Sequence, residues 1–294
     1  MNKVALILPV LAGIMFGGGG VFVRTLSSYG MENATILFTR VFFGTILMGL
    51  FLLFYNKDLL KIKLKDLPIF AGTGVLGMMA LNLCYNRSLV DLTLSLASVL
   101  LCTAPVFVVI FAAVLFKEKI TKKKIGCMGL AIIGCIFASG LLESQSTGPV
   151  SGVGVFFGIL TAVFYAFYTI FSRIATDRGY NTYTVIFYSV LLNAIVVFPL
   201  SDIDIVGSYI ADAPITNILY MCVYAMCTSI LPYIFITLAL LYAEAGMVSI
   251  LASGAEPVAA VFFGVLFYSE VPTLLMLVGI ALTIAALTIL CKKD

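Results

Sequence analysis

Residues 105–118 read PVFVVIFAAVLFKE, and residues 257–270 read PVAAVFFGVLFYSE. Each stretch begins with a proline and ends with a glutamate thirteen residues later, and the residues between are almost all apolar. A match between two distant parts of one chain indicates a weak internal repeat.

The repeat extends toward the start of each half of the chain. The further matched positions are Phe16-Gly17 with Tyr165-Ala166, Arg24 with Arg173, and Gly30 with Gly179. We therefore expect two halves, residues 1–145 and 146–294, which hold five helices each within one membrane unit. Because five is odd, the second half would enter the membrane from the side opposite to the first. Inverted repeats of this kind support two related conformations, one open to each membrane face, around a site near the midplane.

The composition is that of a membrane protein. Of the 294 residues, 62% are hydrophobic and only 11% are charged, whereas soluble domains carry roughly 25% charged residues. A membrane-spanning helix needs about 20 mostly apolar residues. We expect such helices at residues 4–23, 34–55, 67–86, 94–116, 125–142, 152–172, 183–200, 214–241, 247–268 and 272–291.

The predicted fold class is therefore an all-α polytopic membrane protein, with ten transmembrane helices arranged as two inverted five-helix repeats. The alternating pattern of membrane barrel strands is absent. The longest connecting segment, 201–213, is too short to form a soluble domain.

The distribution of lysine and arginine predicts the orientation. With a cytoplasmic N-terminus, fourteen of these residues fall in inside segments and only Arg24 and Arg87 fall outside, while Arg40 lies within the second helix. Short cytoplasmic segments are enriched in Lys and Arg. We therefore expect a multi-pass protein of the inner (plasma) membrane with both termini in the cytoplasm.

An ordered set of motifs along the whole chain resembles the drug/metabolite transporter superfamily, in particular its ten-helix EamA-type exporters. The residues that carry the resemblance are Phe16-Gly17, Arg40, Tyr85 with Ser88-Leu89, Pro105 to Glu118, Gly126, Gly134, Glu256-Pro257 to Glu270, and Gly279. The chain departs from the family pattern because it lacks Trp, where Trp-Gly is usual in the first helix. The resemblance implies export of amino acids, amines or related metabolites.

Glu256 and Arg40 stand well inside predicted helices. A charged side chain in the bilayer costs roughly 2.5–3.5 kcal/mol on insertion scales, so it usually faces a cavity or a partner. Pro257 leaves a backbone carbonyl free near Ser253, which predicts a kinked polar helix around Glu256. Arg40 could bind a substrate carboxylate through two hydrogen bonds. The alternatives are structural pairing for Glu256, and for Arg40 a gate or an ion pair, for instance with Glu32.

Several polar and aromatic residues share helix faces and could line a central pocket. They are Asn82, Tyr85 and Asn86 on the third helix, Tyr165 and Tyr168 on the sixth, and Tyr233 with Thr237 on the eighth. Tyrosines together with a carboxylate suit a cationic amine through cation–π attraction. The alternative for each aromatic residue is lipid contact or packing between helices.

Glycines and prolines mark candidate hinges or close contacts. Gly17 and Gly18 belong to a run of four glycines, and Gly13 with Gly17 forms a GxxxG pair that permits close helix packing. Pro105 and Pro257 are the matched prolines of the repeat. For the matched glutamates, Glu118 and Glu270, we expect helix capping or pairing within loops.

The leading hypothesis is a secondary transporter that exports a small polar metabolite, such as an amino acid or amine, by alternating access. Two alternatives remain: an uptake transporter for a cationic or quaternary amine such as choline, and a membrane receptor or assembly partner without transport. The absence of His and of clustered intramembrane carboxylates argues against an enzyme.

The expected partners are the small-molecule substrate and the lipid bilayer. A coupling proton is one option, and Glu256 would be its acceptor. We expect no cofactor, metal or nucleic acid, and a monomer is the working assumption.

Overall fold

The computed structural model describes residues 3–92, 94–139, 141–142, 151–269 and 271–291. The first half contains α1 (Lys3–Ser28), α2 (Asn33–Tyr55), α3 (Leu67–Ala71), α4 (Leu81–Asp91), α5 (Leu94–Leu101), α6 (Ala104–Phe116) and α7 (Lys122–Ala138). The second half contains α8 (Gly152–Asp177), α9 (Thr182–Val197), α10 (Ile203–Asp212), α11 (Pro214–Ala225), α12 (Leu231–Ala239), α13 (Ala245–Tyr268) and α14 (Leu274–Cys291). Two π-helical stretches, η3 (Gly72–Ala80) and η5 (Met226–Ile230), join α3 to α4 and α11 to α12. The short 3-10 turns are η1 (Lys57–Leu60), η2 (Leu64–Asp66) and η4 (Phe198–Leu200).

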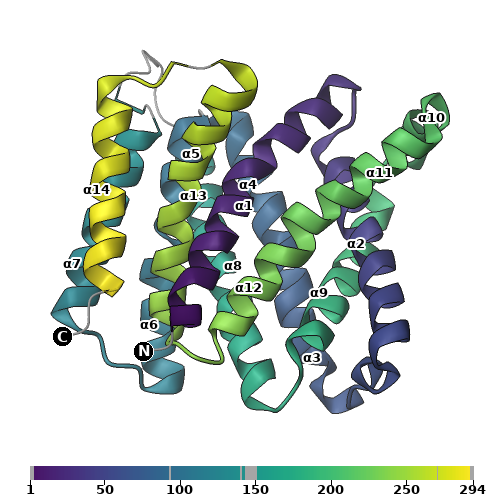
Figure 1. Ribbon diagram of the computed structural model, residues 1–294, viewed down its shortest axis with the longest axis horizontal. Helices are drawn as coiled ribbons and strands as arrows, with labels where there is room; N and C mark the ends of the chain where they lie inside the picture. The colour runs from purple at the N-terminus through teal and green to yellow at the C-terminus, as the bar shows by residue number, and fades with distance from the viewer. Residues whose placement is uncertain (1–2, 93, 140, 143–150, 270, 292–294) are drawn as a thin grey trace.

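Nine stretches within these ranges are long and apolar enough to cross a membrane. The remaining predicted helix, residues 125–142, corresponds to α7, which has 17 residues and packs closely against α14. Figure 1 shows this pair at one edge of the molecule and α2 near the other, with both chain ends on the same side. The all-α polytopic fold predicted from the sequence is therefore confirmed.

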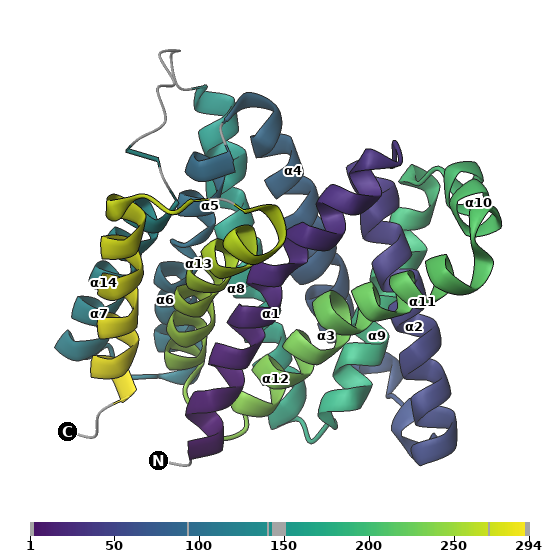
Figure 2. The same cartoon turned by 45° about the horizontal axis from the view of Figure 1, so that its top comes forward.

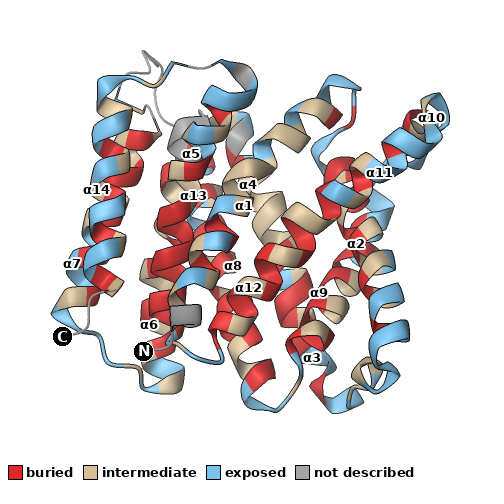
Figure 3. Ribbon diagram, in the orientation of Figure 1, coloured by how far each residue is buried: buried red, intermediate tan, exposed pale blue. Residues whose placement is uncertain are grey.

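The buried residues concentrate in the middle of the bundle. Figure 3 shows them on α8, α12 and α13, whereas α14 and α2 turn exposed faces outward. The exposed residues on the outer helices include many large apolar side chains, such as Phe54 and Val114. Such a surface is typical of a protein whose solvent is lipid.

Matched positions of the sequence repeat have the same unusual backbone geometry. Gly30 and Gly179 both have φ of 83°, and each follows a long helix. Lys117 has φ of 56° and Ser269 has φ of 53°, each at the residue before a matched glutamate position. A positive φ is uncommon for residues other than glycine, so the two halves share these turns in detail.

The third and eighth membrane-spanning segments also share a feature. Each is interrupted by a π-helical stretch, η3 in the first half and η5 in the second. A π-helical stretch shifts the register of the side chains that follow it, and such stretches often occur at functional sites.

One expectation about the helices was wrong. Residues 94–116 were expected to form one helix, but the helix breaks between α5 and α6, and Pro105 lies in the first turn of α6. Proline is well tolerated there because the first-turn N–H has no partner within the helix. Segment 201–213, which we predicted to be too short for a soluble domain, contains the short helix α10, which packs against α11 and α2. Asp202 caps α10 because its side chain accepts hydrogen bonds from the Asp204 and Ile205 amides.

The second matched proline, Pro257, lies inside a helix rather than at its start. The helix α13 continues through this proline from Ala245 to Tyr268. The matched prolines therefore have different surroundings, and the fourth and ninth membrane-spanning segments have different shapes.

Candidate substrate site

An aromatic cluster lies where α1, α8 and α12 meet. The Tyr233 ring packs edge-on against the rings of Phe16, at 5.1 Å between centroids, and Tyr168, at 4.7 Å. The hydroxyls of Tyr168 and Thr237 are hydrogen-bonded at 2.9 Å. The structure therefore brings together the tyrosine faces that the sequence indicates on the sixth and eighth helices.

Glu256 lies beside this cluster, on the side of α13 that meets α1. A Cβ atom placed on Gly17 would be 2.4 Å from the Glu256 carbonyl oxygen, so the two backbones are in close contact. Gly13 approaches the carbonyl of Ala252 in the same way, at 2.3 Å. The GxxxG pair of α1 thus holds α13 against it, and this places the middle of α13 next to Phe16.

The Glu256 side chain is half-buried and lies within electrostatic reach of tyrosine hydroxyls. It acts electrostatically on the hydroxyls of Tyr165 and Tyr233, and Tyr165 also interacts with the Ser253 side chain. Within the part of the chain that the structure describes, no hydrogen bond or ion pair joins this carboxylate to another side chain. The structural pairing that was the alternative role for Glu256 is therefore not found there.

Arg40 approaches the same cluster from α2. Its guanidinium group interacts with the Tyr224 hydroxyl and acts electrostatically on Tyr233. Its Nε atom is buried and has no hydrogen-bond partner among the described residues. Tyr233 therefore lies within the electrostatic reach of both intramembrane charges.

The contribution of Tyr224 was missed in the sequence analysis. Tyr224 and Tyr233 are nine residues apart, which in a regular α-helix places them on opposite faces, roughly 180° apart. The π-helical stretch η5 lies between them and shifts the register, so both tyrosines can face Arg40. The hydrophobic pattern carries no signal for this shift.

The three residues of the predicted polar face of the third helix lie on α4. The Asn82 side-chain amide donates to the Met78 carbonyl of its own helix at 2.6 Å. Tyr85 and Asn86 are half-buried on α4, which packs against α8. No described contact joins these three side chains to Glu256 or Tyr233, and they remain predicted lining residues.

The glycines of η3 position Tyr168. A Cβ atom on Gly77 would be 2.6 Å from the Tyr168 Cα atom, so α8 lies directly against η3. Gly74 makes a similar approach to the Ser189 carbonyl on α9, at 2.4 Å. A Cβ atom on Gly18 would be 2.9 Å from the Phe263 ring. These glycines act here as close packing positions.

One end of the bundle is closed by contacts between the two halves. We call it the basic end; it comprises the start of α1, the turn after α6, the end of α8, the turn before α13 and the end of α14. At this end Glu118 accepts hydrogen bonds from the Ala245 amide at 2.8 Å and the Gly246 amide at 3.4 Å. Lys124 lies between Glu118 and Glu244 and contacts both carboxylates. Glu118 therefore caps α13, as expected, whereas Glu270 lies outside the described residues.

Arginines of the second half make further contacts at this end. Arg173 donates to the Leu240 and Ala243 carbonyls in the turn before α13. Arg178 pairs with Asp66 of the first half, which also accepts a hydrogen bond from the Tyr180 hydroxyl at 2.7 Å. Burial and then this hydrogen bond raise the pKa of Tyr180.

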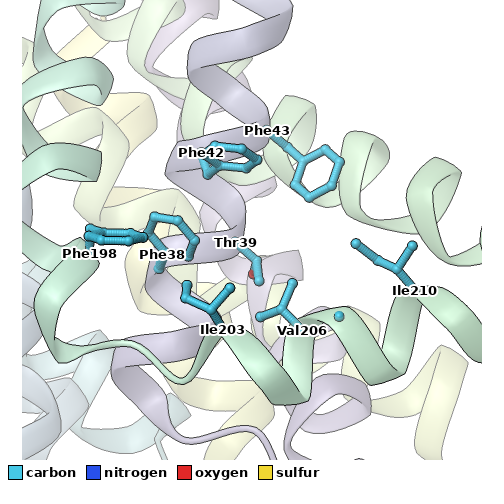
Figure 4. A pocket seen from close by; sticks show the side chains of 9 residues that line it. Phe38, Thr39, Phe42, Phe43, Phe198, Ile203, Val206 and Ile210 are labelled. Atoms are coloured by element: carbon cyan, nitrogen blue, oxygen red, sulfur yellow. The ribbon is translucent and has the colours of Figure 1, made fainter.

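A separate apolar pocket of about 270 Å³ lies between α2, η4 and α10. Figure 4 shows its aromatic and aliphatic lining, which includes Phe38, Phe42, Phe43 and Ile203. No charged side chain lines it, so it does not suit a polar metabolite. No group of three His, Cys, Asp or Glu residues within the described ranges is arranged to hold a metal ion.

Comparisons with known proteins agree with this architecture. A model of the EamA-like transporter family matches residues 3–140 and again residues 152–291. The chain is similar to the Pseudopaline exporter CntI of Pseudomonas aeruginosa, with 27% identity over 288 residues that cover 97% of this chain and 94% of the relative. It is also similar to an uncharacterized transporter of Archaeoglobus fulgidus, with 23% identity and coverage of 97% and 95%. One solved crystal structure matches with a TM-score of 0.77 at 16% identity, covering 98% of this chain and 96% of the other, and shows the shared fold.

Proposed function

The chain belongs to the EamA-like transporter family, and from this premise we propose that it is a secondary exporter of a small polar metabolite such as an amino acid or amine. The substrate would bind between two inverted halves, residues 1–145 and 146–294, and reach either membrane face by alternating access. Family membership makes the protein a multi-pass membrane transporter rather than an enzyme.

The observation that carries the proposal is the cluster around Tyr233. Residues of the first half, Phe16 and Arg40, meet residues of the second half, Tyr168, Tyr233 and Glu256, near the middle of the bundle. A site made by both halves changes its exposure when the halves move relative to one another. Unpaired charges in such a place are typical of substrate pathways.

The closed basic end supports alternating access. Its capping contacts and ion pairs join the halves through Glu118 to α13 and through Asp66 to Arg178. In the proposed orientation this end lies in the cytoplasm of the cell (inner or plasma membrane), because it carries most of the lysines and arginines. The conformation described here would then be the one closed to the cytoplasm. Figure 2 shows α1 running from the basic end, beside the two chain termini, to the opposite end of the bundle.

Counterflow into liposomes tests this function. Purified protein is reconstituted into vesicles preloaded with unlabelled amino acids, polyamines or quaternary amines, and accumulation of the same labelled compound is measured. The proposal expects saturable accumulation that Glu256→Gln reduces at least tenfold. Accumulation no greater than in empty liposomes for every compound would reject transport and favour a receptor role. The export direction then requires loss of substrate from energised cells, and a rate unchanged by a pH gradient would exclude a coupling proton.

Uptake of a cationic amine is the second candidate function. The observation in its favour is the set of aromatic rings beside Glu256, which suits cation–π binding. Accumulation, rather than loss, of a quaternary amine in energised cells would select this alternative.

A further inference from the structure

The apolar pocket between α2, η4 and α10 shares no lining residue with the aromatic cluster around Tyr233. Its wall on α2 runs from Phe38, the sixth residue of that helix, to Phe43, the eleventh. At a rise of about 1.5 Å per residue, this is roughly 9–16 Å from the end of α2 opposite the basic end. Because a hydrocarbon core is about 30 Å thick, the pocket lies in the half of the membrane opposite the basic end.

The pocket is walled by a continuous row of aromatic rings. The Phe38 ring contacts the rings of Phe198 and Phe42, at 5.6 Å and 5.3 Å between centroids, and Phe42 contacts Phe43 at 5.7 Å. Phe42 is 42% exposed and Phe198 is 54% exposed. The row therefore continues from the pocket onto the outer surface of the bundle, where lipid is the solvent.

The chemistry and size of the pocket suit part of an apolar chain. The hydroxyl of Thr39, which is the polar side chain in the lining, already donates to the Ile36 carbonyl at 2.9 Å. The volume of about 270 Å³ is slightly below the range of small-ligand pockets, which begins at about 300 Å³. A segment of an acyl chain that enters from the bilayer fits this volume.

The helix α10 separates this pocket from the polar end of the bundle. Figure 4 shows Ile203, Val206 and Ile210 on the side of α10 that faces the phenylalanines of α2. Asp204 and Ser208 lie on another face of the helix and are exposed. An amphipathic helix of this kind lies at the boundary between headgroups and acyl chains, with its apolar face toward the chains.

The mouth of the pocket is acidic. Asp204 directly follows the lining residue Ile203, and Asp202 and Asp212 flank the same helix. Residues 179–291 contain no Lys or Arg, and the exposed Glu32 precedes α2 beside this region. Among the described residues no hydrogen bond or ion pair joins the Asp204 carboxylate to another side chain. This charge distribution attracts a cationic headgroup and repels an anionic one.

We propose that the pocket is a binding site for a phospholipid with a primary amine in its headgroup, such as phosphatidylethanolamine. One acyl chain lies along the row of phenylalanines, and the ammonium group pairs with the carboxylate of Asp204 through a charge-assisted hydrogen bond. The site is independent of the proposed transport function, because neither the aromatic cluster nor Glu256 takes part in it.

The absence of Trp from the chain allows a direct test by fluorescence. Phe198→Trp places a single fluorophore in the pocket wall, and Phe262→Trp places one on α13, where Phe262 is 61% exposed. Each protein is reconstituted into mixtures of phosphatidylethanolamine and phosphatidylglycerol in which one of the two lipids carries brominated acyl chains, which quench Trp on contact. At Phe198→Trp we expect brominated phosphatidylethanolamine to be preferred roughly threefold or more over its mole fraction, the size expected for one charge near a membrane surface. Quenching at Phe262→Trp should follow the mole fraction.

Two further variants in the Phe198→Trp protein separate the chain from the headgroup. A Cβ atom on the lining residue Gly207 meets nothing within 4 Å, so Gly207→Leu fills the pocket without a backbone clash and should abolish the preference. Gly129→Leu is the matched control, because Gly129 on α7 is also free of contacts within 4 Å. Asp204→Asn should abolish the preference for the amine headgroup, whereas Asp58→Asn at the basic end should leave it unchanged.

Three results would overturn the lipid site. The first is quenching in proportion to mole fraction at Phe198→Trp, which would mean that lipids exchange there without selection. The second is a preference for phosphatidylglycerol, which would contradict the role of the acidic residues. The third is an unchanged preference in Gly207→Leu, which would mean that no chain occupies the pocket. Elution volume confirms the fold of each variant, and none of these results bears on counterflow.

Discussion

The hydroxyl of Tyr168 illustrates that a buried polar atom in this bundle needs a hydrogen-bond partner. Tyr168 is only 1% exposed, and its hydroxyl is hydrogen-bonded to the Thr237 hydroxyl on α12. Buried polar groups without a partner are costly, because no water replaces the lost hydrogen bond. The pair therefore fixes the position of α8 relative to α12, and with it the edge of the proposed site.

Replacing Tyr168 with Phe should lower the free energy of unfolding by roughly 1–2 kcal/mol, because Thr237 loses its partner. Adding Thr237→Val should restore part of this loss, since both polar groups are then removed. Unfolding by denaturant in detergent measures each variant. Additive losses in the double variant would show that the two hydroxyls do not stabilise one another.

Tyr180 at the basic end predicts a dependence on pH. Its pKa is raised in the folded protein by burial and by its bond to Asp66, whereas an unfolded tyrosine titrates near pH 10. The stabilisation is therefore complete below about pH 10 and is lost as pH rises through the raised value. Melting temperatures measured from pH 8 to above pH 11 should fall less steeply for Tyr180→Phe than for the wild type.

Tyr242→Phe provides the matched control for this titration, because Tyr242 is 56% exposed. It should follow the wild-type curve. Identical alkaline curves for Tyr180→Phe and the wild type would contradict the assignment.

At the level of elements, the contact between α1 and α13 decides where Glu256 lies. Gly13 and Gly17 let the α1 backbone touch the α13 backbone directly. This contact runs from Ala252 to Ala260 and so covers the position of Pro257. Support along this length gives a physical reason why α13 stays continuous through the proline.

Gly17→Ala should destabilise the protein by about 1–3 kcal/mol, because the new Cβ atom meets backbone atoms that cannot move aside easily. Its distance to the Glu256 carbonyl oxygen would be 2.4 Å. Gly20→Ala on the same helix meets nothing within 4 Å and should be neutral or stabilising by up to about 1 kcal/mol. Thermal unfolding in detergent compares the two. Equal melting temperatures would mean that α1 and α13 do not pack as described.

At the level of the whole molecule, the halves carry matched sequences but differ in shape. The fourth membrane-spanning segment is broken into α5 and α6, whereas its counterpart α13 is continuous. Arg173 binds the turn before α13, while its counterpart Arg24 is exposed at the opposite end. In alternating access the halves exchange such roles, so Arg24 should bind the end of α4 when that side closes.

Arg173→Ala and Arg24→Ala should therefore have different effects. Arg173→Ala removes bonds present in this conformation and should lower the melting temperature. Arg24→Ala should slow counterflow several-fold, because it weakens the alternative closed state. Normal counterflow by Arg24→Ala would argue against exchanged closures.

Local sequence features were sufficient for the membrane fold. Apolar stretches of membrane-spanning length and a low charged content identify the helices, because a bilayer tolerates little else. The matched Pro105 and Pro257 stretches identify the repeat, since each half needs the same turns, and the positive φ values of Lys117 and Ser269 fit this reading. The hydroxyl faces of Tyr168, Tyr233 and Thr237 were also predictable from helical spacing.

Contacts between distant segments decided the arrangement of the candidate site and the shape of the helices at the two matched prolines. The meeting of Tyr224 and Tyr233 near Arg40 depends on the register shift in η5, which no hydrophobic period records. The break before Pro105 and the continuity through Pro257 depend on what packs beside each proline, because the two residues have the same local sequence role. The sequence by itself therefore determined a repeated membrane bundle with two internal charges. Only the tertiary structure brought those charges to one aromatic cluster, because their placement depends on helices from both halves.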